Sequence, residues 1–318
     1  MKKRIIACLL IIVTFFLLFA LQARAISKAQ DVSDGNDEEN DEIRGLAPVA
    51  VSENGKYLIN SEGDPFFWMG DTAWDMIHRL TKEEIIAYLD NRQEKGLSVI
   101  LFRLVLQDLE GEPQHDNVYG LVPFENKDIT KPNEAYFELV DFVLDEIEKR
   151  GMVAGVLPMW GFVVGGQLGY SVTAEDIEVY ANWLSNRYKD RKNIIWVSGG
   201  DTGHDKGWEI LGRELKKADP EKLVTFHPGR PGISSYHLYG DTDWLDFHMT
   251  QTGHSPYLET NYLAINEIYI ESDKPILNGE PAYEDMLVIE SGGRISPYQV
   301  RKAAYWSLLS GGFGHVYG

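Results

Sequence analysis

Two acidic residues follow short apolar runs that end in glycine, a pattern that suits the cleavage of glycosidic bonds. Asp201 comes directly after Trp196–Gly200, and Glu280 comes directly after Ile276–Gly279. Such cleavage needs one carboxylic acid to protonate the leaving oxygen and a second carboxylate to attack the anomeric carbon or to activate water. A single acidic residue at a strand end is more often a turn or cap residue, but two that each follow a glycine favour catalysis. We therefore predict Asp201 and Glu280 as the catalytic carboxyl groups.

Further polar and aromatic residues stand at the ends of apolar runs, where purely structural strands would need none. Aromatic faces suit sugar rings, and charged or amide side chains suit their hydroxyl groups. Because a buried charge is costly unless it is paired, Arg103 either orients a carboxylate or binds substrate. The alternative for Asp71 is an Asx turn or helix cap, and the alternative for Trp74 and Trp160 is the core. The predicted substrate-binding residues are Asp71, Trp74, Arg103, Trp160, His227, His248 and Gln251.

The histidines raise the alternative of a metal site, but their spacing does not favour one. No H-x-H or H-E-x-x-H pattern occurs in the chain, whereas metal-dependent hydrolases usually show a tight ligand pair. No G-x-G-x-x-G or G-x-x-x-x-G-K-[ST] pattern follows an apolar run, which argues against a nucleotide site. The sequence therefore predicts no metal and no cofactor. The histidines considered are His227, His237, His248, His254 and His315.

The elements that would position these residues alternate between apolar runs and helical patterns. Near-continuous apolar strands separated by amphipathic helices indicate a parallel sheet covered by helices. About eight such units favour a closed barrel over an open doubly wound sheet, with the active site at the carboxyl ends of the strands. The predicted fold class is α/β, a (β/α)8 TIM barrel truncated after strand eight. The predicted strands span residues 66–70, 98–106, 152–160, 193–198, 223–227, 244–249, 274–279 and 314–317. The predicted helices begin near 81 and 133 and span 173–188, 206–217, 257–270 and 297–309, and a hairpin at 49–59 would close the bottom.

The amino terminus has the features of an export signal. The basic start Met1–Arg4, the apolar run Ile5–Leu21 and the A-x-A site Ala23–Ala25 are typical of a secretory signal peptide. The alternative is a membrane anchor, since the apolar run is near the lower limit for a span. The predicted organisation is a signal peptide over 1–25, an acidic disordered linker over 26–48 and a (β/α)8 catalytic domain over 49–318. The predicted location is secreted, either extracellular or periplasmic. Cys8, the only cysteine, would leave with the signal peptide, so the mature chain would have no disulfide.

The charge of the chain limits its partners. The formal net charge is −19, and the predicted mature chain is more acidic still because residues 1–25 carry four basic and no acidic residues. Such a surface repels nucleic acid and anionic membranes. We expect a carbohydrate partner, no nucleic acid, and no stable membrane insertion after the signal peptide is cleaved.

Five stretches of the chain carry a resemblance to a known family: Phe67–Trp74, Val156–Gly161, Asn193–Asp201, Trp244–His254 and Asn278–Pro281. They resemble motifs of the apiosidase-like glycoside hydrolases, of glycoside hydrolase family 140 type, from about residue 50 to the end. The resemblance implies a (β/α)8 domain that acts on plant cell-wall glycans, with Asp201 as acid/base and Glu280 as nucleophile. The best-known activity of the family removes apiose side chains from the pectin rhamnogalacturonan II.

Two departures from the pattern accompany this resemblance. Family members usually continue into a small β-rich domain of collagen-binding type, which we expect this chain to lack. Related barrel glycosidases generally have an Asn-Glu pair after strand four, where this chain has Gly200-Asp201. The shorter acid agrees with the pattern of the apiosidase-like family itself.

The leading hypothesis is a secreted retaining glycoside hydrolase of plant cell-wall glycans, with apiosidase-like action on pectic side chains as its most specific form. One alternative is an endo-glycanase on a polysaccharide backbone, which an open groove would favour. Another is a non-catalytic carbohydrate-binding barrel. The sequence disfavours the binding barrel, which has no need to keep both Asp201 and Glu280.

Overall fold

A computed structural model describes residues 47–105, 116–161, 172–229, 231–254, 259–288 and 292–318. The predicted signal peptide lies outside these residues, as does the predicted linker except for its last two positions. The central element is an eight-stranded sheet whose hydrogen-bonded neighbours all run parallel. The strands are β4 (Trp68–Thr72), β5 (Val99–Arg103), β6 (Val153–Leu157), β7 (Ile194–Thr202), β8 (Val224–Pro228), β9 (His248–Gln251), β10 (Ile276–Glu280) and β13 (Gly314–Tyr317).

The sheet curls into a nearly closed barrel. Its strand order is β8-β7-β6-β5-β4-β13-β10-β9, so the two edge strands are β8 and β9. Three hydrogen bonds join these edges: Asp246 N donates to Val224 O at 2.9 Å, Val224 N donates to Asp246 Oδ2 at 2.7 Å, and Thr225 Oγ1 donates to Phe247 O at 2.7 Å. A side-chain carboxylate thus replaces part of the missing ladder at this seam. The predicted TIM-barrel fold is confirmed.

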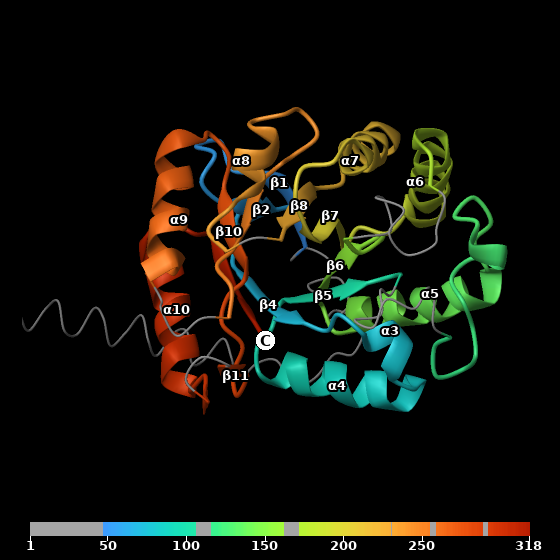
Figure 1. Ribbon diagram of the computed structural model, residues 1–318, viewed down its shortest axis with the longest axis horizontal. Helices are drawn as coiled ribbons and strands as arrows, with labels where there is room; N and C mark the ends of the chain where they lie inside the picture. The colour runs from blue at the N-terminus through green and yellow to red at the C-terminus, as the bar shows by residue number, and fades with distance from the viewer. Residues whose placement is uncertain (1–46, 106–115, 162–171, 230, 255–258, 289–291) are drawn as a thin grey trace, which may run out of the picture. The chain divides into compact units, whose positions relative to one another are not determined.

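Helices follow the strands and cover the outside of the barrel (Figure 1). Several begin at a capping box that the sequence signals, in which a Ser or Thr hydroxyl and the side chain three residues later satisfy each other's backbone N–H groups. Thr81, Thr173 and Ser296 are such caps. Figure 1 shows α9 and α10 side by side along one flank. The helices are α3 (Met76–Arg79), α4 (Lys82–Glu94), α5 (Glu134–Lys149), α6 (Ala174–Tyr188), α7 (Lys206–Ala218), α8 (Ser235–Tyr239), α9 (Glu259–Glu271) and α10 (Pro297–Leu309), with a 3-10 turn at Glu125–Lys127.

The core has two layers, one between the helices and the sheet and one inside the barrel. A small antiparallel sheet closes the barrel at the amino ends of its strands, formed by β1 (Pro48–Val51), β2 (Leu58–Asn60) and β3 (Pro65–Phe66). Leu58 from this sheet packs in the barrel interior with Val99 and Val153, which begin β5 and β6. A second hairpin joins β11 (Leu287–Val288) to β12 (Gly293–Arg294). Of the helices in the described residues, none is both long and apolar enough for a membrane crossing.

Candidate active site

Asp201 reaches the barrel mouth because the end of β7 leaves regular strand geometry. Gly199, Gly200 and Asp201 have φ angles of 89°, 111° and 47°, all in the left-handed region. The pairing register between β7 and β8 also shifts between Gly199 and Thr202. Such irregularities next to functional sites re-aim a side chain. The result is that Asp201 stands at the carboxyl end of the strand, exposed as a whole residue although its carboxyl group is largely removed from solvent.

Glu280 reaches the same mouth through a similar irregularity in β10. Leu277 faces the barrel interior, so strict alternation along the strand would turn Glu280 toward the helices. The register between β10 and β9 shifts between Asn278 and Glu280, and this shift brings the buried carboxylate to the mouth. Gly279 is required here, since a Cβ at this position would lie 2.3 Å from Met249 Sδ.

Four side chains surround the carboxylate of Glu280, two as hydrogen-bond donors and two as histidines at ion-pair distance. Tyr283 Oη donates to Oε1 at 2.7 Å and Gln251 Nε2 donates to Oε2 at 2.8 Å, while His254 Nε2 lies 3.2 Å from Oε1 and His227 Nε2 lies 3.1 Å from Oε2. Burial by itself raises the pKa of Glu280, but the interactions with His227, His254 and Tyr283 outweigh it and hold the pKa well below its ordinary range. Glu280 is therefore an ionised, buried carboxylate.

Asp201 and Glu280, which we call the carboxyl pair, share one hydrogen-bond donor. Gln251 Nε2 donates to Asp201 Oδ1 at 2.7 Å and to Glu280 Oε2 at 2.8 Å. One oxygen of each carboxyl group lies within 4.8 Å of the other. Loss of solvent around the Asp201 carboxyl, followed by the negative charge of Glu280, raises the pKa of Asp201. The pair thus combines a carboxyl group that keeps its proton more readily with one that stays ionised.

Aromatic rings form one wall beside the carboxyl pair. The ring centroids of Trp74 and Trp160 lie 5.0 Å apart, and those of Trp74 and His227 lie 5.5 Å apart. Trp74 Nε1 donates to Tyr283 Oη at 2.9 Å, so the indole also orients a phenol that bonds Glu280. Arg103 stacks on Trp160 at 4.8 Å and forms an ion pair with Asp75. The planes of Trp74 and Trp160 are tilted by 58°, and Trp160 is buried with Arg103 over its face, so the half-buried Trp74 is the ring of this wall that a sugar can contact.

A buried amide network anchors the loop that follows Gln251 at the end of β9 and carries His254. Asn278 Nδ2 donates to Thr252 Oγ1, Asn261 Oδ1 and Ser307 Oγ at 2.9–3.0 Å. The backbone N–H groups of Thr252 and Gly253 both donate to the carbonyl oxygen of Glu280 at 3.1 and 3.2 Å. The loop is therefore tied to the same strand end that carries Glu280.

The structure places five of the seven predicted binding residues around the carboxyl pair and the other two outside it. Asp71 points to the outer side of β4, where Tyr88 Oη donates to its Oδ2 at 2.7 Å and Arg92 Nη1 at 2.8 Å. Burial raises the pKa of Asp71, and these two partners oppose that effect. From its position at a strand end we expected Asp71 at the barrel mouth, but its side chain lies on the outer side of the strand. His227 and Gln251 contact the pair directly, Trp74 and Trp160 lie beside it next to the His227 ring, and Arg103 is further back, packed on Trp160 and paired with Asp75.

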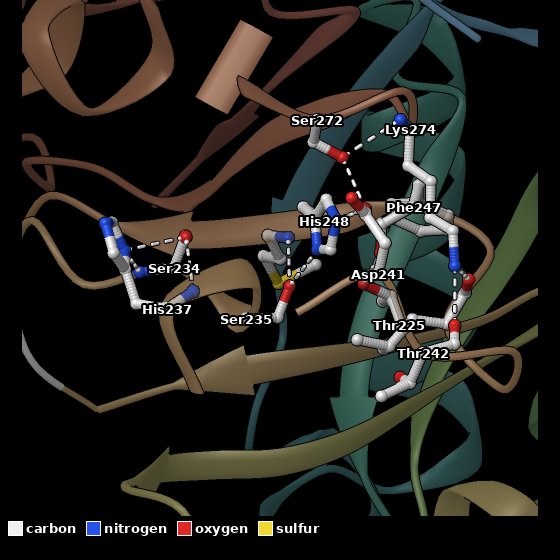
Figure 2. Close-up of polar contacts among 12 residues, drawn as sticks. Thr225, Ser234, Ser235, His237, Asp241, Thr242, Phe247, His248, Ser272 and Lys274 are labelled. Atoms are coloured by element: carbon white, nitrogen blue, oxygen red, sulfur yellow. Dashed lines mark hydrogen bonds and ion pairs between the residues drawn. The ribbon is translucent and has the colours of Figure 1, made fainter. Parts of the chain in front are cut away.

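His248 also lies outside the mouth, in a polar cluster beside the barrel seam. Its Nδ1 lies 3.0 Å from Ser235 Oγ and its Nε2 lies 2.9 Å from Asp241 Oδ1, as Figure 2 shows. The Ser-His-Asp order resembles a hydrolase triad, but Ser235 is fully buried and its Oγ accepts a hydrogen bond from Met249 N. Ser272 Oγ bonds the same Asp241 oxygen. This cluster holds α8 against β9. His248 was expected to bind substrate at the mouth, but its side chain lies in this cluster instead.

Two residues of the site were not predicted as site residues from the sequence. From the sequence, His254 is a candidate only as a metal ligand, and Tyr283 is not a candidate. Both lie in loops, each three residues after a predicted site residue, Gln251 and Glu280 respectively. The sequence signal that could have found His254 is the preceding Gly253, a residue type that permits the left-handed φ of 77° found there.

One group in the described residues has the composition of a metal site. Asp201, His227 and Glu280 each offer a ligand atom, and these atoms lie within 4.8 Å of one another. Gln251 Nε2 already donates to both carboxylates. A cation ligated by both at the usual distance of about 2.0–2.2 Å would have to displace this amide, so the arrangement fits an internal hydrogen-bond network better than a cation.

Solved glycoside hydrolases share this fold. One described simply as a glycoside hydrolase is 30% identical with a TM-score of 0.75, and the match covers 86% of this chain and 65% of that chain. A glycoside hydrolase family 5 protein from Bacteroides vulgatus ATCC 8482 is 31% identical with a TM-score of 0.74, covering 85% of this chain and 62% of the other. This chain thus spans less than two thirds of the length of either. An endo-1,4-β-D-mannanase from Thermotoga petrophila RKU-1, at 16% identity and a TM-score of 0.54, covers 79% of this chain and 88% of its own, and shares the fold alone.

The barrel with its paired carboxyl groups at the mouth is thus a glycoside hydrolase fold. More specifically, the chain belongs to the Apiosidase-like catalytic-domain family, whose model matches residues 52–318. No curated protein matches the chain. The family resemblance inferred from the sequence motifs is confirmed.

Proposed function

We propose that this chain is a retaining glycoside hydrolase in which Asp201 is the acid/base and Glu280 the nucleophile. The observation that carries the proposal is the carboxyl pair, with one oxygen of each group within 4.8 Å of the other at the ends of β7 and β10. Retaining enzymes have carboxyl groups about 5–5.5 Å apart, whereas inverting enzymes leave about 6.5–9.5 Å for a water molecule. The nearest oxygens lie within 4.8 Å of each other, below the range of inverting enzymes, and this supports retention.

The two charge states suit the two steps of a retaining reaction. In the first step Glu280 attacks the anomeric carbon while Asp201 donates its proton to the leaving oxygen, which forms a glycosyl ester and releases an alcohol. In the second step the Asp201 carboxylate takes a proton from water, and the hydroxide attacks the anomeric carbon and frees Glu280. The raised pKa of Asp201 and the lowered pKa of Glu280 support these roles.

The proposed substrate class is a plant cell-wall glycan, and its most specific form is an apiosyl group on a pectic side chain. The match to the Apiosidase-like family supports this choice, and the half-buried ring of Trp74 beside the carboxyl pair supports contact with a sugar ring. We also propose that the protein acts outside the cytoplasm, on the strength of the signal-peptide features of residues 1–25.

The test is a screen of the purified protein against a panel of aryl glycosides and pectic fragments, with the released sugar identified. We expect one sugar to be released, with the anomeric configuration of its first product retained by proton NMR. Glu280→Ala should abolish release, while Glu53→Ala, an exposed acid in the turn after β1, should match the wild type. No release from any substrate, or full activity in Glu280→Ala, would overturn the proposal.

A further inference from the structure

Gln251 occupies a position between the two carboxyl groups that the reaction scheme leaves unexplained. It ends β9, is buried, and its Nε2 is within hydrogen-bond distance of both Asp201 Oδ1 and Glu280 Oε2. A primary amide nitrogen carries two hydrogens, so it can donate to both carboxyl groups at once. The opposite orientation would bring the amide oxygen against two acceptors, which is unfavourable whenever either group is ionised. The amide nitrogen is therefore the atom that faces the pair.

The surroundings of Gln251 fix where this amide can point. Its Cα pairs with that of Glu280 across the β9–β10 ladder, and its carbonyl oxygen accepts a hydrogen bond from Gly232 N at 2.8 Å. The next two backbone N–H groups, from Thr252 and Gly253, donate to the carbonyl oxygen of Glu280. Gln251 and Glu280 thus form one rigid unit against which Asp201 is oriented.

We propose that Gln251 is a positioning residue that holds the catalytic proton of Asp201 on Oδ2, because its amide hydrogen occupies Oδ1. The proposal rests on the proposed acid/base role of Asp201. Nε2 can only donate, and the carbonyl oxygen of a carboxylic acid accepts a hydrogen bond better than the hydroxyl oxygen does, so a protonated Asp201 carries its hydrogen preferentially on Oδ2. In the described part of the chain no donor bonds Oδ2 of Asp201, which leaves that oxygen to meet the leaving group. Gln251 thereby turns a carboxyl group with two equivalent oxygens into an acid with a preferred proton position.

The same hydrogen bond also acts in the second step, when Asp201 must be a carboxylate. The titratable groups that face Asp201 are Glu280 from β10, and His227 from β8 and His254 from the loop after β9. The charge of Glu280 opposes ionisation of Asp201, and the two histidines and the Gln251 amide favour it. Loss of the amide should therefore make Asp201 harder to ionise and less well oriented as an acid.

The test compares Gln251→Leu and Gln251→Glu with the wild type on two glycosides of one sugar, taken from the panel described above. One glycoside has a nitrophenyl leaving group, which departs without protonation, and the other has an alkyl leaving group, which needs it. The measured quantity is kcat/KM as a function of pH, because it reports the first, acid-catalysed step. Gln93→Leu is the matched control, since the same change falls on an exposed residue whose amide bonds Arg150 O, away from the mouth.

For Gln251→Leu we expect kcat/KM on the alkyl glycoside to fall about ten- to hundredfold, the usual weight of a hydrogen bond to a charged group. The nitrophenyl glycoside should lose much less, and the alkaline limb of the alkyl profile should move up by about one pH unit. Gln251→Glu has nearly the same shape and, when protonated, offers a single hydrogen to the pair. It should approach wild-type activity only at low pH, and this readout remains if Gln251→Leu does not fold.

Equal losses on both glycosides with an unmoved alkaline limb, or no loss at all, would overturn the inference. A wild type that releases no sugar, or an active Glu280→Ala variant, would instead overturn the proposed function itself. The two failures are thus separable. An unchanged melting temperature in each variant shows that an altered profile arises at the site and not from loss of the fold.

Discussion

Gly200→Ala tests whether the glycine before Asp201 is required by the geometry of the mouth. Gly200 has a φ of 111°, and a Cβ on it would lie 2.7 Å from Cε3 and 2.8 Å from Cδ2 of Trp160. Carbon atoms pack at about 3.5–4.0 Å, so the two groups overlap by roughly 1 Å. Trp160 cannot easily retreat, because it is buried against Trp74 and carries Arg103 on its face.

The cost of this change has two parts. Left-handed strain at a residue with a side chain costs about 1–3 kcal/mol, and overpacking a closed core costs about 1–3 kcal/mol. A total of roughly 2–6 kcal/mol would lower the melting temperature of a domain of this size by roughly 4–24 °C, at about 2–4 °C per kcal/mol. A displacement of about 1 Å at Asp201 would lower kcat/KM by about a hundredfold.

The control is Gly203→Ala, three residues further along, where an added Cβ meets nothing within 4 Å and φ is not positive. The melting temperature of this variant, and its kcat/KM on a nitrophenyl glycoside, should be close to those of the wild type. If Gly200→Ala melts and turns over like Gly203→Ala, the steric account of the mouth is wrong.

Three further predictions concern the acid Asp201, the buried His315 and the metal requirement of the enzyme. Asp201→Ala should lower kcat/KM about 10²–10⁴-fold on an alkyl glycoside but far less on a nitrophenyl glycoside, and azide should restore turnover by replacing the water that needs a base; equal losses without azide rescue would assign the acid elsewhere. Burial lowers the pKa of His315 to about 4, whereas the unfolded chain takes up this proton near pH 6.5. Acidification from pH 6.5 to 4 therefore favours unfolding, and His315→Gln should remove about 2–3 kcal/mol of that pH dependence in chemical denaturation; an unchanged slope would contradict it. Dialysis against a chelator should leave activity intact, since Gln251 already bridges the carboxyl pair; a loss that zinc or calcium restores would refute this.

Much of the barrel could be predicted because its elements carry strong local signals. The helix 297–309 and the strand 314–317 have the predicted bounds, since a Ser-Pro start and two glycines delimit them. The short helices α3 and α8 were not predicted, because four or five residues show no helical period. The sixth barrel strand was predicted at 244–249 but spans His248–Gln251. Residues 244–247 instead form a loop at the seam, where the side chain of Asp246 bonds Val224 of β8.

The site could be predicted as far as strand ends determine it. Asp201, His227, Gln251 and Glu280 meet because parallel strands present their carboxyl ends at one edge. Glu280 faces the mouth because of a register shift in its strand. No residue pattern in the sequence predicts this shift. Regular alternation, by contrast, sends Asp71 to the outer face of its strand, and it sends His248 outward in the same way.

Capture of the covalent intermediate tests the central claim most directly. A 2-fluoro glycoside with a dinitrophenyl leaving group, made from the sugar that the panel identifies, should form the glycosyl ester faster than water can cleave it. We predict that mass spectrometry of the digested protein places the added glycosyl mass on Glu280, and that Glu280→Ala acquires none. Continued turnover without any adduct, or an adduct on another residue, would contradict the assignment of Glu280 as the nucleophile of a retaining enzyme.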